Sequence, residues 1–410
     1  MRKNWSGNVI FQENEYLEPK SVGELQEMIK SRSHIHVRGS GHSFNSIADS
    51  TKSIVNLASI PQVIEIDEAK RCVKVSSSLK YGEIVETIES KGWAISNLAS
   101  LPHISIGGSI ATATHGSGIK NRNLASQVSA FEYIDSSGNI HHVEENHRDF
   151  NALLIGLGVA GIVTYYWLKL EPSFKVRQII YENLSENELE NSFNQIMSTA
   201  YSVSFFTKWD QTQRGNLWCK FRETESIPEK IAMATKATRK LHPIPEVDPE
   251  AATEQFGEPG LWLERLAHFK LDFTPSVGEE IQSEFFVDRK NAPSVVALLR
   301  DLAPTFNHML WISELRTIAA DKLWMSTAYE RDSVGFHFTW KKSNFDMNIV
   351  KNIEDNLKKF NYRPHWGKVF NSDSDYLKSV YPKYADFISA CRELDPQGKF
   401  LNDFAKRLLS

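Results

Sequence analysis

RGSGHSFNS, residues 38–46, places two glycines, three serines and a histidine in one run after a short predicted strand at 34–37. Gly39 and Gly41 allow positive backbone φ, so successive N–H groups can turn inward and form an anion-binding nest. The serine hydroxyls add further hydrogen-bond donors. The run therefore fits a phosphate-binding loop, although taken alone this pattern is more often a surface turn.

His42 is the unusual residue of this run. A single histidine in a loop is by default structural or metal-binding. A metal site needs several ligands, and His34 and His36 on the preceding strand are poorly placed to supply them. We therefore expect no metal here.

Length and composition indicate a folded protein of two domains, since 410 residues exceed one ordinary core. Apolar residues make up 41% and charged residues 24% of the chain, which is ordinary for a soluble protein. A net charge of −4 provides no electrostatic basis for binding nucleic acid or anionic lipid. We expect neither partner.

The cysteines and the N-terminus favour a cytoplasmic protein. Cys72, Cys219 and Cys391 are widely separated, a spacing that argues against a disulfide framework and against a zinc site. The first 20 residues lack the apolar region of a signal peptide.

The uncharged stretch 152–168 resembles two functional features, a membrane span and a dinucleotide-binding loop, and each has to be weighed against an ordinary buried segment. At 17 residues it is at the lower limit for a membrane span, but its glycines divide it into a helical half and a β-rich half. Residues 156–161 match GxGxxG, yet a helix precedes them and a strand follows, the reverse of a dinucleotide-binding fold. We predict a buried helix, a tight turn and a strand.

The N-terminal part reads as a mixed unit of helices and strands. A second glycine-rich run, 104–118, contains small residues that would let a ligand approach the backbone. The other predicted elements are helices from about 21 to 30, 82–91 and 149–157, strands at 54–57, 63–67, 72–76 and 162–170, and a hairpin at 131–144.

Two later segments carry polar groups at strand spacing. In HMLWISELRTI (308–318), Glu314 and Arg316 share one strand face. In SVGFHFTWK (333–341), the even positions are apolar, whereas the odd face carries His337 and Thr339. If the strands pair, these four side chains meet in a patch suited to a hydroxylated molecule. The alternative is a solvated sheet face with a surface ion pair.

Together, RGSGHSFN, SLPHISIGGSIATATHGSG, GLGVAGIVT and RPHWGKVF resemble the vanillyl-alcohol-oxidase superfamily of flavoproteins, and most closely its alditol (xylitol) oxidases. The resemblance implies an α+β, two-domain flavoprotein. Residues 1–173 would form the FAD-binding domain, residues 174–363 a sheet-based substrate (cap) domain, and residues 364–410 a tail that completes the FAD-binding domain.

The resemblance also implies roles for individual residues. His42 would be bonded covalently to the 8α-methyl group of FAD. Glu314, Arg316, His337 and Lys368 would carry the catalysis, and Ser100, Glu314, Arg316, Thr339 and Lys368 would bind substrate. The implied cofactor-contacting residues are Arg38, Gly39, Ser40, Gly41, His42, Ser43, Ser100, Ser105, Gly108, Thr112, Thr114, His115, Gly116, Ile162, Val163 and His365.

The implied reaction is oxidation of the terminal CH–OH of a polyol such as xylitol or sorbitol to the aldose. Hydride would pass to flavin N5, and O2 would reoxidise the flavin to give H2O2. His337 is the candidate proton acceptor, because its ordinary pKa lies near working pH. The expected partners are a small polyol and O2, with the protein a monomer.

Two alternatives remain at this point. A related aldonolactone oxidase or dehydrogenase would share the histidine-bearing loop and the HWGK segment, although SELRT and the match at 337–340 favour an open-chain polyol. A flavin- or sugar-binding protein without catalysis is the more remote alternative.

Overall fold

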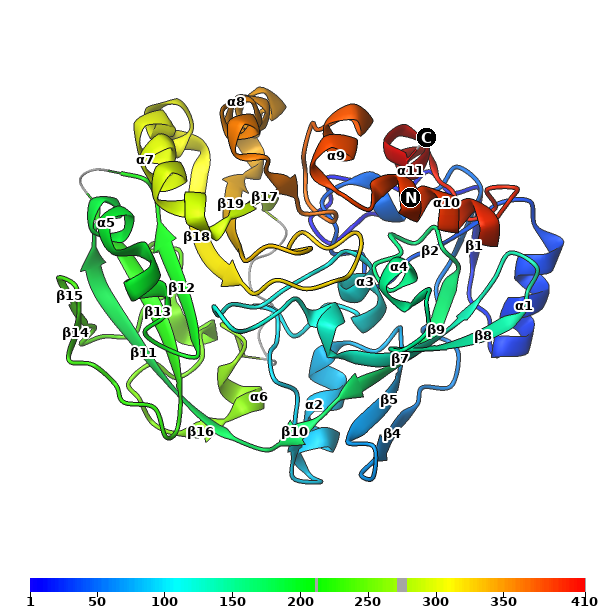
Figure 1. Ribbon diagram of the computed structural model, residues 1–410, viewed down its shortest axis with the longest axis horizontal. Coiled ribbons are helices and arrows are strands. Elements are labelled where there is room, and N and C mark those ends of the chain that lie inside the picture. The colour runs from blue at the N-terminus through cyan, green and yellow to red at the C-terminus, as the bar shows by residue number, and fades with distance from the viewer. Residues whose placement is uncertain (211–212, 271–278, 410) are drawn as a thin grey trace.

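The computed structural model describes residues 1–210, 213–270 and 279–409. Its N-terminal part contains a five-stranded antiparallel sheet in the order β4-β5-β9-β7-β8 and a small parallel sheet in the order β1-β3-β2 (Figure 1). The strands are β1 Glu15–Leu17, β2 Ile35–Val37, β3 Ser53–Val55, β4 Ile64–Asp67, β5 Cys72–Ser76, β7 Val128–Ile134, β8 Ile140–Glu144 and β9 Ile162–Lys169. The helices are α1 Val22–Ser31, α2 Tyr81–Glu89, α3 Ile106–Ala111 and α4 Phe150–Leu153.

Local sequence accounts for most of these elements. Helix α1 begins where predicted because the Ser21 side chain accepts a hydrogen bond from the Glu24 N–H, and Leu25 and Ile29 bury one helical face. Strand β9 alternates between buried and half-buried positions along its length, as a strand with one face in the core should.

The predicted helix at 149–157 was too long, since α4 ends at Leu153. Leu157 and Gly158 adopt φ of 52° and 77°, left-handed values that continue no α-helix, and the chain turns there into β9. The predicted order of helix, turn and strand is confirmed. No helix in the described ranges is long and apolar enough to cross a membrane.

A ten-stranded sheet dominates the rest of the chain, with the order β14-β15-β11-β13-β12-β18-β19-β17-β20 and β16 paired beside β11. Its strands are β11 Lys175–Leu184, β12 Ser202–Thr207, β13 Gly215–Arg222, β14 Lys230–Ile231, β15 Ala234–Lys236, β16 Gly260–Leu261, β17 Glu280–Asp288, β18 Leu310–Ile318, β19 Ser333–Lys341 and β20 Arg363–Pro364. A short pair, β6 Trp93–Ala94 with β10 Glu171–Pro172, lies where the chain passes into this sheet.

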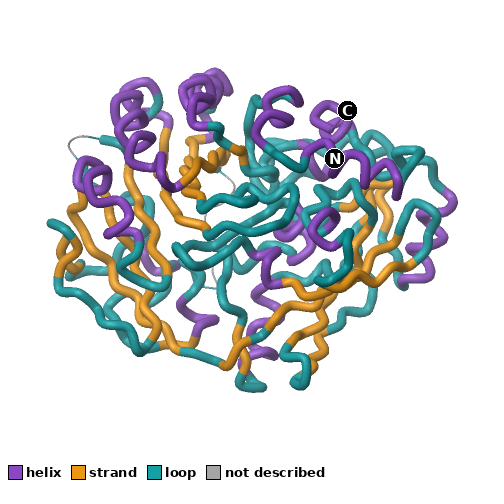
Figure 2. Tube along the Cα trace, viewed as in Figure 1, coloured by secondary structure: helices purple, strands orange, loops and turns teal. Residues whose placement is uncertain are grey.

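Helices cover one face of the large sheet. Helices α5 Glu186–Met197, α7 Ala292–Leu302 and α8 Met347–Leu357 lie along its upper side in Figures 1 and 2. The even positions of β19, Val334 to Trp340, are fully buried in the same core cluster as Val295 and Leu299 of α7. The polar positions of β19 consequently face the other side, toward the N-terminal part of the molecule.

The C-terminal segment returns to the N-terminal part. Helices α9 Ser374–Val380, α10 Tyr384–Leu394 and α11 Asp403–Leu409 appear in red beside the N-terminal segments in Figure 1. Helix α10 contacts α4, and the buried His36 ring lies 2.8 Å from the Phe400 carbonyl oxygen. The remaining helix, α6 Trp262–Arg265, packs against β11.

Candidate active site

A cavity of about 370 Å³ lies where the N-terminal part meets the polar face of the large sheet. Both glycine-rich runs and strands β17, β18 and β19 contribute to its wall. All the residues predicted to bind cofactor or substrate line this cavity, except Gly116 and Ile162. The volume is in the range of small-molecule sites.

Gly116 and Ile162 lie beside the cavity rather than on its wall. Ile162 is fully buried in a separate apolar cluster with Leu25 and Ile29, and strand alternation turns the neighbouring Val163 toward the cavity instead. A Cβ on Gly116 would lie 2.5 Å from the Leu98 carbonyl oxygen, so its backbone packs against that segment.

The loop at 38–43 is held against the second glycine-rich run. Ser40 N–H donates to Ser105 Oγ at 3.1 Å, and Ser105 N–H donates to Ser40 Oγ at 3.0 Å. A Cβ on Gly39 would lie 2.3 Å from Ser105 Oγ, and Gly41 has φ of 76°, so glycine is required at both positions. The run is therefore part of a cavity wall and not a surface turn.

His42 lies in this wall with its ring stacked on Trp5 at 5.4 Å between ring centroids. Its Nδ1 is 3.0 Å from Ser40 Oγ. Burial, with the positive charges of His103 and Lys80, lowers the pKa of His42 to about 4. The imidazole is therefore neutral at neutral pH, the form that can act as a nucleophile.

The helix-to-strand turn at 156–161 is more than a connection. Its glycines line the cavity, and a Cβ on Gly158 would lie 3.1 Å from the His36 ring, in the strand that leads into the loop at 38–43. The residue pattern alone predicted only a tight turn here, whereas the flavoprotein resemblance included GLGVAGIVT among its motifs, and the position of these glycines on the cavity wall agrees with the resemblance. The order of elements decides against a dinucleotide fingerprint, but it does not decide which surface the turn faces.

Three adjacent strands bring the polar side chains of the large sheet together. In the β18–β19 pair Glu314 is opposite His337, and in the β19–β17 pair His337 is opposite Glu284. Arg316 lies one step along, opposite Gly335. Directly opposed residues project to the same side of a sheet. The condition for the polar patch, that β18 and β19 pair, is thus met, and the alternative of a solvated sheet face is wrong because these side chains are buried.

Arg316 is buried and holds several groups together. Its Nη1 donates to Ser100 Oγ at 3.2 Å, and its Nε lies 3.4 Å from Glu314 Oε2. Burial acts to raise the pKa of Glu314, but Arg316 and His268 hold it well below its ordinary value. Glu314 is consequently ionised and accepts hydrogen bonds only.

His337 is 7% exposed, and among the described residues neither of its ring nitrogens has a hydrogen-bond partner. Burial and the charge of Lys368 keep the pKa of His337 well below its ordinary value, so the ring is neutral. Buried polar atoms in native proteins are nearly always hydrogen-bonded. Both ring nitrogens can therefore form hydrogen bonds with a molecule bound in the cavity.

Sequence reasoning missed two residues of the site. His268 lies on the cavity wall, and its Nε2 is 3.0 Å from Glu314 Oε1. Glu284 lies in β17, and its Oε2 accepts a hydrogen bond from Lys368 Nζ at 2.7 Å. Period-two spacing in EIQSEFFVD marks Glu284 as an acid in an apolar strand, but nothing in the local sequence around His268 indicates its role.

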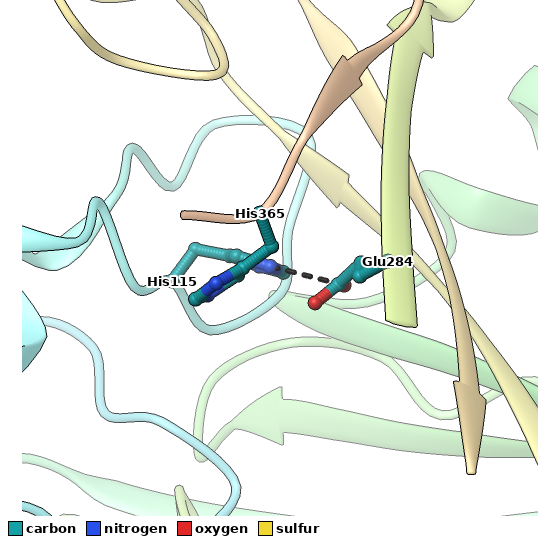
Figure 3. A group of neighbouring side chains, drawn as sticks. All are labelled: His115, Glu284 and His365. Carbon is teal, nitrogen blue, oxygen red and sulfur yellow. Dashed lines mark hydrogen bonds and ion pairs between the residues drawn. The ribbon is translucent and has the colours of Figure 1, made fainter. Parts of the chain in front are cut away.

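His115, Glu284 and His365 form a buried group with the spacing of metal ligands (Figure 3). Both carboxylate oxygens of Glu284 already have cationic partners, Arg316 at Oε1 and Lys368 at Oε2. A divalent ion here would lie beside two positive charges in a medium of low dielectric constant. The surroundings therefore suit an ion-pair network rather than a metal.

The wall residues fit a flavin dinucleotide. Glycines at 39 and 107 let the two glycine-rich runs pack closely against Ser105 and Ser77, and the backbone and hydroxyl groups on the cavity wall suit phosphate oxygens. The segments at 38–43 and 105–115 would hold such a group. The charged side chains of the large sheet, Glu284, Glu314 and Arg316, line the same cavity.

Comparisons with known proteins agree with this arrangement. Residues 15–144 match the model of an FAD binding domain, and residues 277–408 match that of D-arabinono-1,4-lactone oxidase. The chain is 38% identical to alditol oxidase of Streptomyces sp. (strain IKD472 / FERM P-14339), over 99% of this chain and 98% of that protein.

More distant proteins share the fold. L-gulonolactone oxidase of Mus musculus is 22% identical over 99% of this chain and 97% of its own length. A crystal structure of cholesterol oxidase from B. sterolicum superposes with a TM-score of 0.78 at 13% identity, covering 100% of this chain and 96% of the other. By its full-length relationship to the Streptomyces protein, the chain belongs to the alditol oxidase family of FAD-dependent oxidoreductases.

Proposed function

We propose that this protein oxidises the terminal CH–OH of an alditol such as xylitol or sorbitol to the aldose, with O2 as the electron acceptor and H2O2 as the second product. The observation that carries the proposal is the buried His337 ring, which has no partner among the described residues and lies between two carboxylates. Arg316, Lys368 and the loop of His42 face the same cavity.

The charged groups suit an alcohol that loses a proton and a hydride. Glu314, ionised and acceptor-only, would bind hydroxyl groups of the substrate. Arg316 and Lys368 would stabilise negative charge as it develops on the reacting oxygen, a contribution that is large where water is excluded. Thr339 and Ser100 line the same space and add hydroxyl partners.

His337 would accept the hydroxyl proton at one ring nitrogen while the other donates a hydrogen bond. The ring is neutral at neutral pH and so has a lone pair available, but its lowered pKa makes it a weaker base than an ordinary histidine, contrary to the reason for which the sequence suggested it. Glu284 and Glu314 act to raise its pKa and would stabilise the protonated ring. FAD held by the two glycine-rich runs would supply the hydride acceptor and the route for the electrons to O2. Holding the reacting carbon within about 3–3.5 Å of its acceptor would supply much of the rate.

The proposal includes covalent attachment of FAD at His42. A neutral, half-buried imidazole in the wall of the cofactor cavity supports it. Acid precipitation of the purified protein tests it directly, since flavin absorbance should stay with the pellet. In His42→Ala the flavin should move to the supernatant, and a colourless wild-type pellet would exclude the bond.

An aldonolactone oxidase is the second candidate, because residues 277–408 match the D-arabinono-1,4-lactone oxidase model. A peroxide assay that compares xylitol and sorbitol with gulono-lactone distinguishes the two functions. We expect the polyols to give the higher rate, and a higher rate with the lactone would reverse the assignment. Anaerobic bleaching of the flavin by each compound separates substrate oxidation from the reaction with oxygen.

A further inference from the structure

Glu284 is a buried acid at the centre of β17, with 1% of its surface exposed. It lies in the cross-strand row with His337 and Glu314. An unpaired carboxylate in a protein interior is very costly, so a buried one must be compensated by its surroundings. The partners of Glu284 therefore indicate what it does.

Two of these partners, Arg316 and Lys368, are cations, and the third is the ring of His115. Oε1 accepts from Arg316 Nη2 at 3.1 Å and lies 3.1 Å from His115 Nε2, and Oε2 accepts from Lys368 Nζ at 2.7 Å. His115 Nδ1 is also 2.8 Å from the Gly116 carbonyl. Burial and the charge of Arg316 lower the pKa of His115, so the ring is neutral and its single N–H can be donated to only one of these two acceptors.

The sheet leaves room for this carboxylate at one position. Gly335 lies on the polar face of β19, and a Cβ there would be 2.8 Å from Glu284 Oε1. The absence of a side chain at 335 thus lets Glu284 reach across toward Arg316.

We infer that Glu284 is a positioning residue, which holds Arg316 and Lys368 in the cavity and keeps Lys368 charged beside the substrate. This inference depends on the proposed function at one point, because it takes the molecule on which the two cations act to be an alcohol. Without a shared anion, Arg316 and Lys368 would repel each other in a buried site.

The charges around Lys368 support this assignment. Burial lowers the pKa of Lys368, and Glu284 opposes that effect. The titratable and charged groups that face Glu284 or Lys368 from neighbouring elements are His115, Glu314, Arg316, His337 and His365. Glu314 is the other acid in this set, and it is paired with His268 and Arg316.

The first test is the pH profile of anaerobic flavin reduction by xylitol in the Glu284→Gln holoenzyme. The variant keeps the shape of the side chain and removes its charge. Lys368 should then lose its proton at lower pH, so the alkaline limb of the profile should move down by roughly one to three pH units. Gly335→Ala displaces the carboxylate without removing it and should move the limb in the same direction.

The control variant is Glu354→Gln. Glu354 is another buried acid, 2% exposed, whose partners are the Asn371 N–H and the Ser372 hydroxyl, outside the cavity. Its profile should match that of the wild type. An alkaline limb that stays in place in a folded Glu284→Gln protein overturns the inference.

The second test needs no substrate, so it separates this inference from the proposed function. Lys368→Met and Glu284→Gln are compared singly and together by thermal unfolding. Because Glu284→Gln leaves the buried Lys368 without its carboxylate partner, the double variant should unfold at a higher temperature than Glu284→Gln alone. If Glu284→Gln yields no folded protein, recovery of folded protein in the double variant supports the inference. An additive loss of stability, or no recovery, overturns it.

Discussion

Arg316→Met should remove most of the catalysis while leaving the cavity in place. The guanidinium is 5% exposed and contacts three groups, the Ser100 hydroxyl, Glu284 and Glu314. Loss of one buried charge-stabilising donor costs about 10²–10³ in turnover, or about 3–4 kcal/mol. The loss should appear in the maximal rate more than in the apparent affinity, because the developing charge exists mainly in the transition state.

The same change should also lower stability. Removing one partner of a buried ion pair costs about 3–5 kcal/mol. The loss in Arg316→Met should lie toward the lower end, because Glu284 keeps Lys368 and Glu314 keeps His268. Urea unfolding compares the variant with the wild type at neutral pH.

The assay is anaerobic stopped-flow reduction of the flavin by saturating xylitol. Arg316→Lys is the matched control, since it keeps the charge but loses the planar fork that reaches two acceptors at once. It should recover only part of the rate. A Met variant that reduces flavin within about threefold of the wild-type rate would refute the electrostatic role.

Three further predictions use other parts of the site. His337→Ala should slow flavin reduction by about 10²–10⁴ if this ring accepts the proton, and a change within threefold removes that role. Gly39→Ala should lower the flavin content per protein, because its Cβ would lie 2.3 Å from Ser105 Oγ. Gly23→Ala is the control and should keep the flavin content, because its Cβ would have only Ser21 Oγ nearby, at 3.9 Å. Equal flavin absorbance in the two variants would contradict the loop assignment. Burial and the charge of Lys220 lower the pKa of His268 to about 4, so the folded state binds this proton more weakly than the unfolded state and loses stability as pH falls from 6.5 to 4. In urea unfolding, His268→Gln should lose roughly 3 kcal/mol less than the wild type over that range, and parallel losses would show that His268 titrates normally.

Local sequence correctly predicted those features that depend on the residues of a single helix or strand. Helix α1 begins at the predicted cap, and the apolar even positions of β19 predicted which of its faces enters the core. The prediction failed at α4, because apolar residues continue past the left-handed turn that ends the helix.

Only the tertiary structure shows that Glu314, His337 and Glu284 lie side by side on three adjacent strands. Period-two spacing placed Glu314 and Arg316 on one strand face, but Glu284 is 30 positions before Glu314 and joins them only because β17 pairs with β19. His268 gave no periodic signal at all, since it lies outside any helix or strand.

By itself, the sequence determined the two glycine-rich runs and the alternating polar face of β19. These properties depend on backbone freedom and side-chain period over a few residues. Only the tertiary structure decided which charges share one buried cavity and how each is paired. Electrostatic energy depends on distance and burial, and neither quantity is encoded by neighbours along the chain.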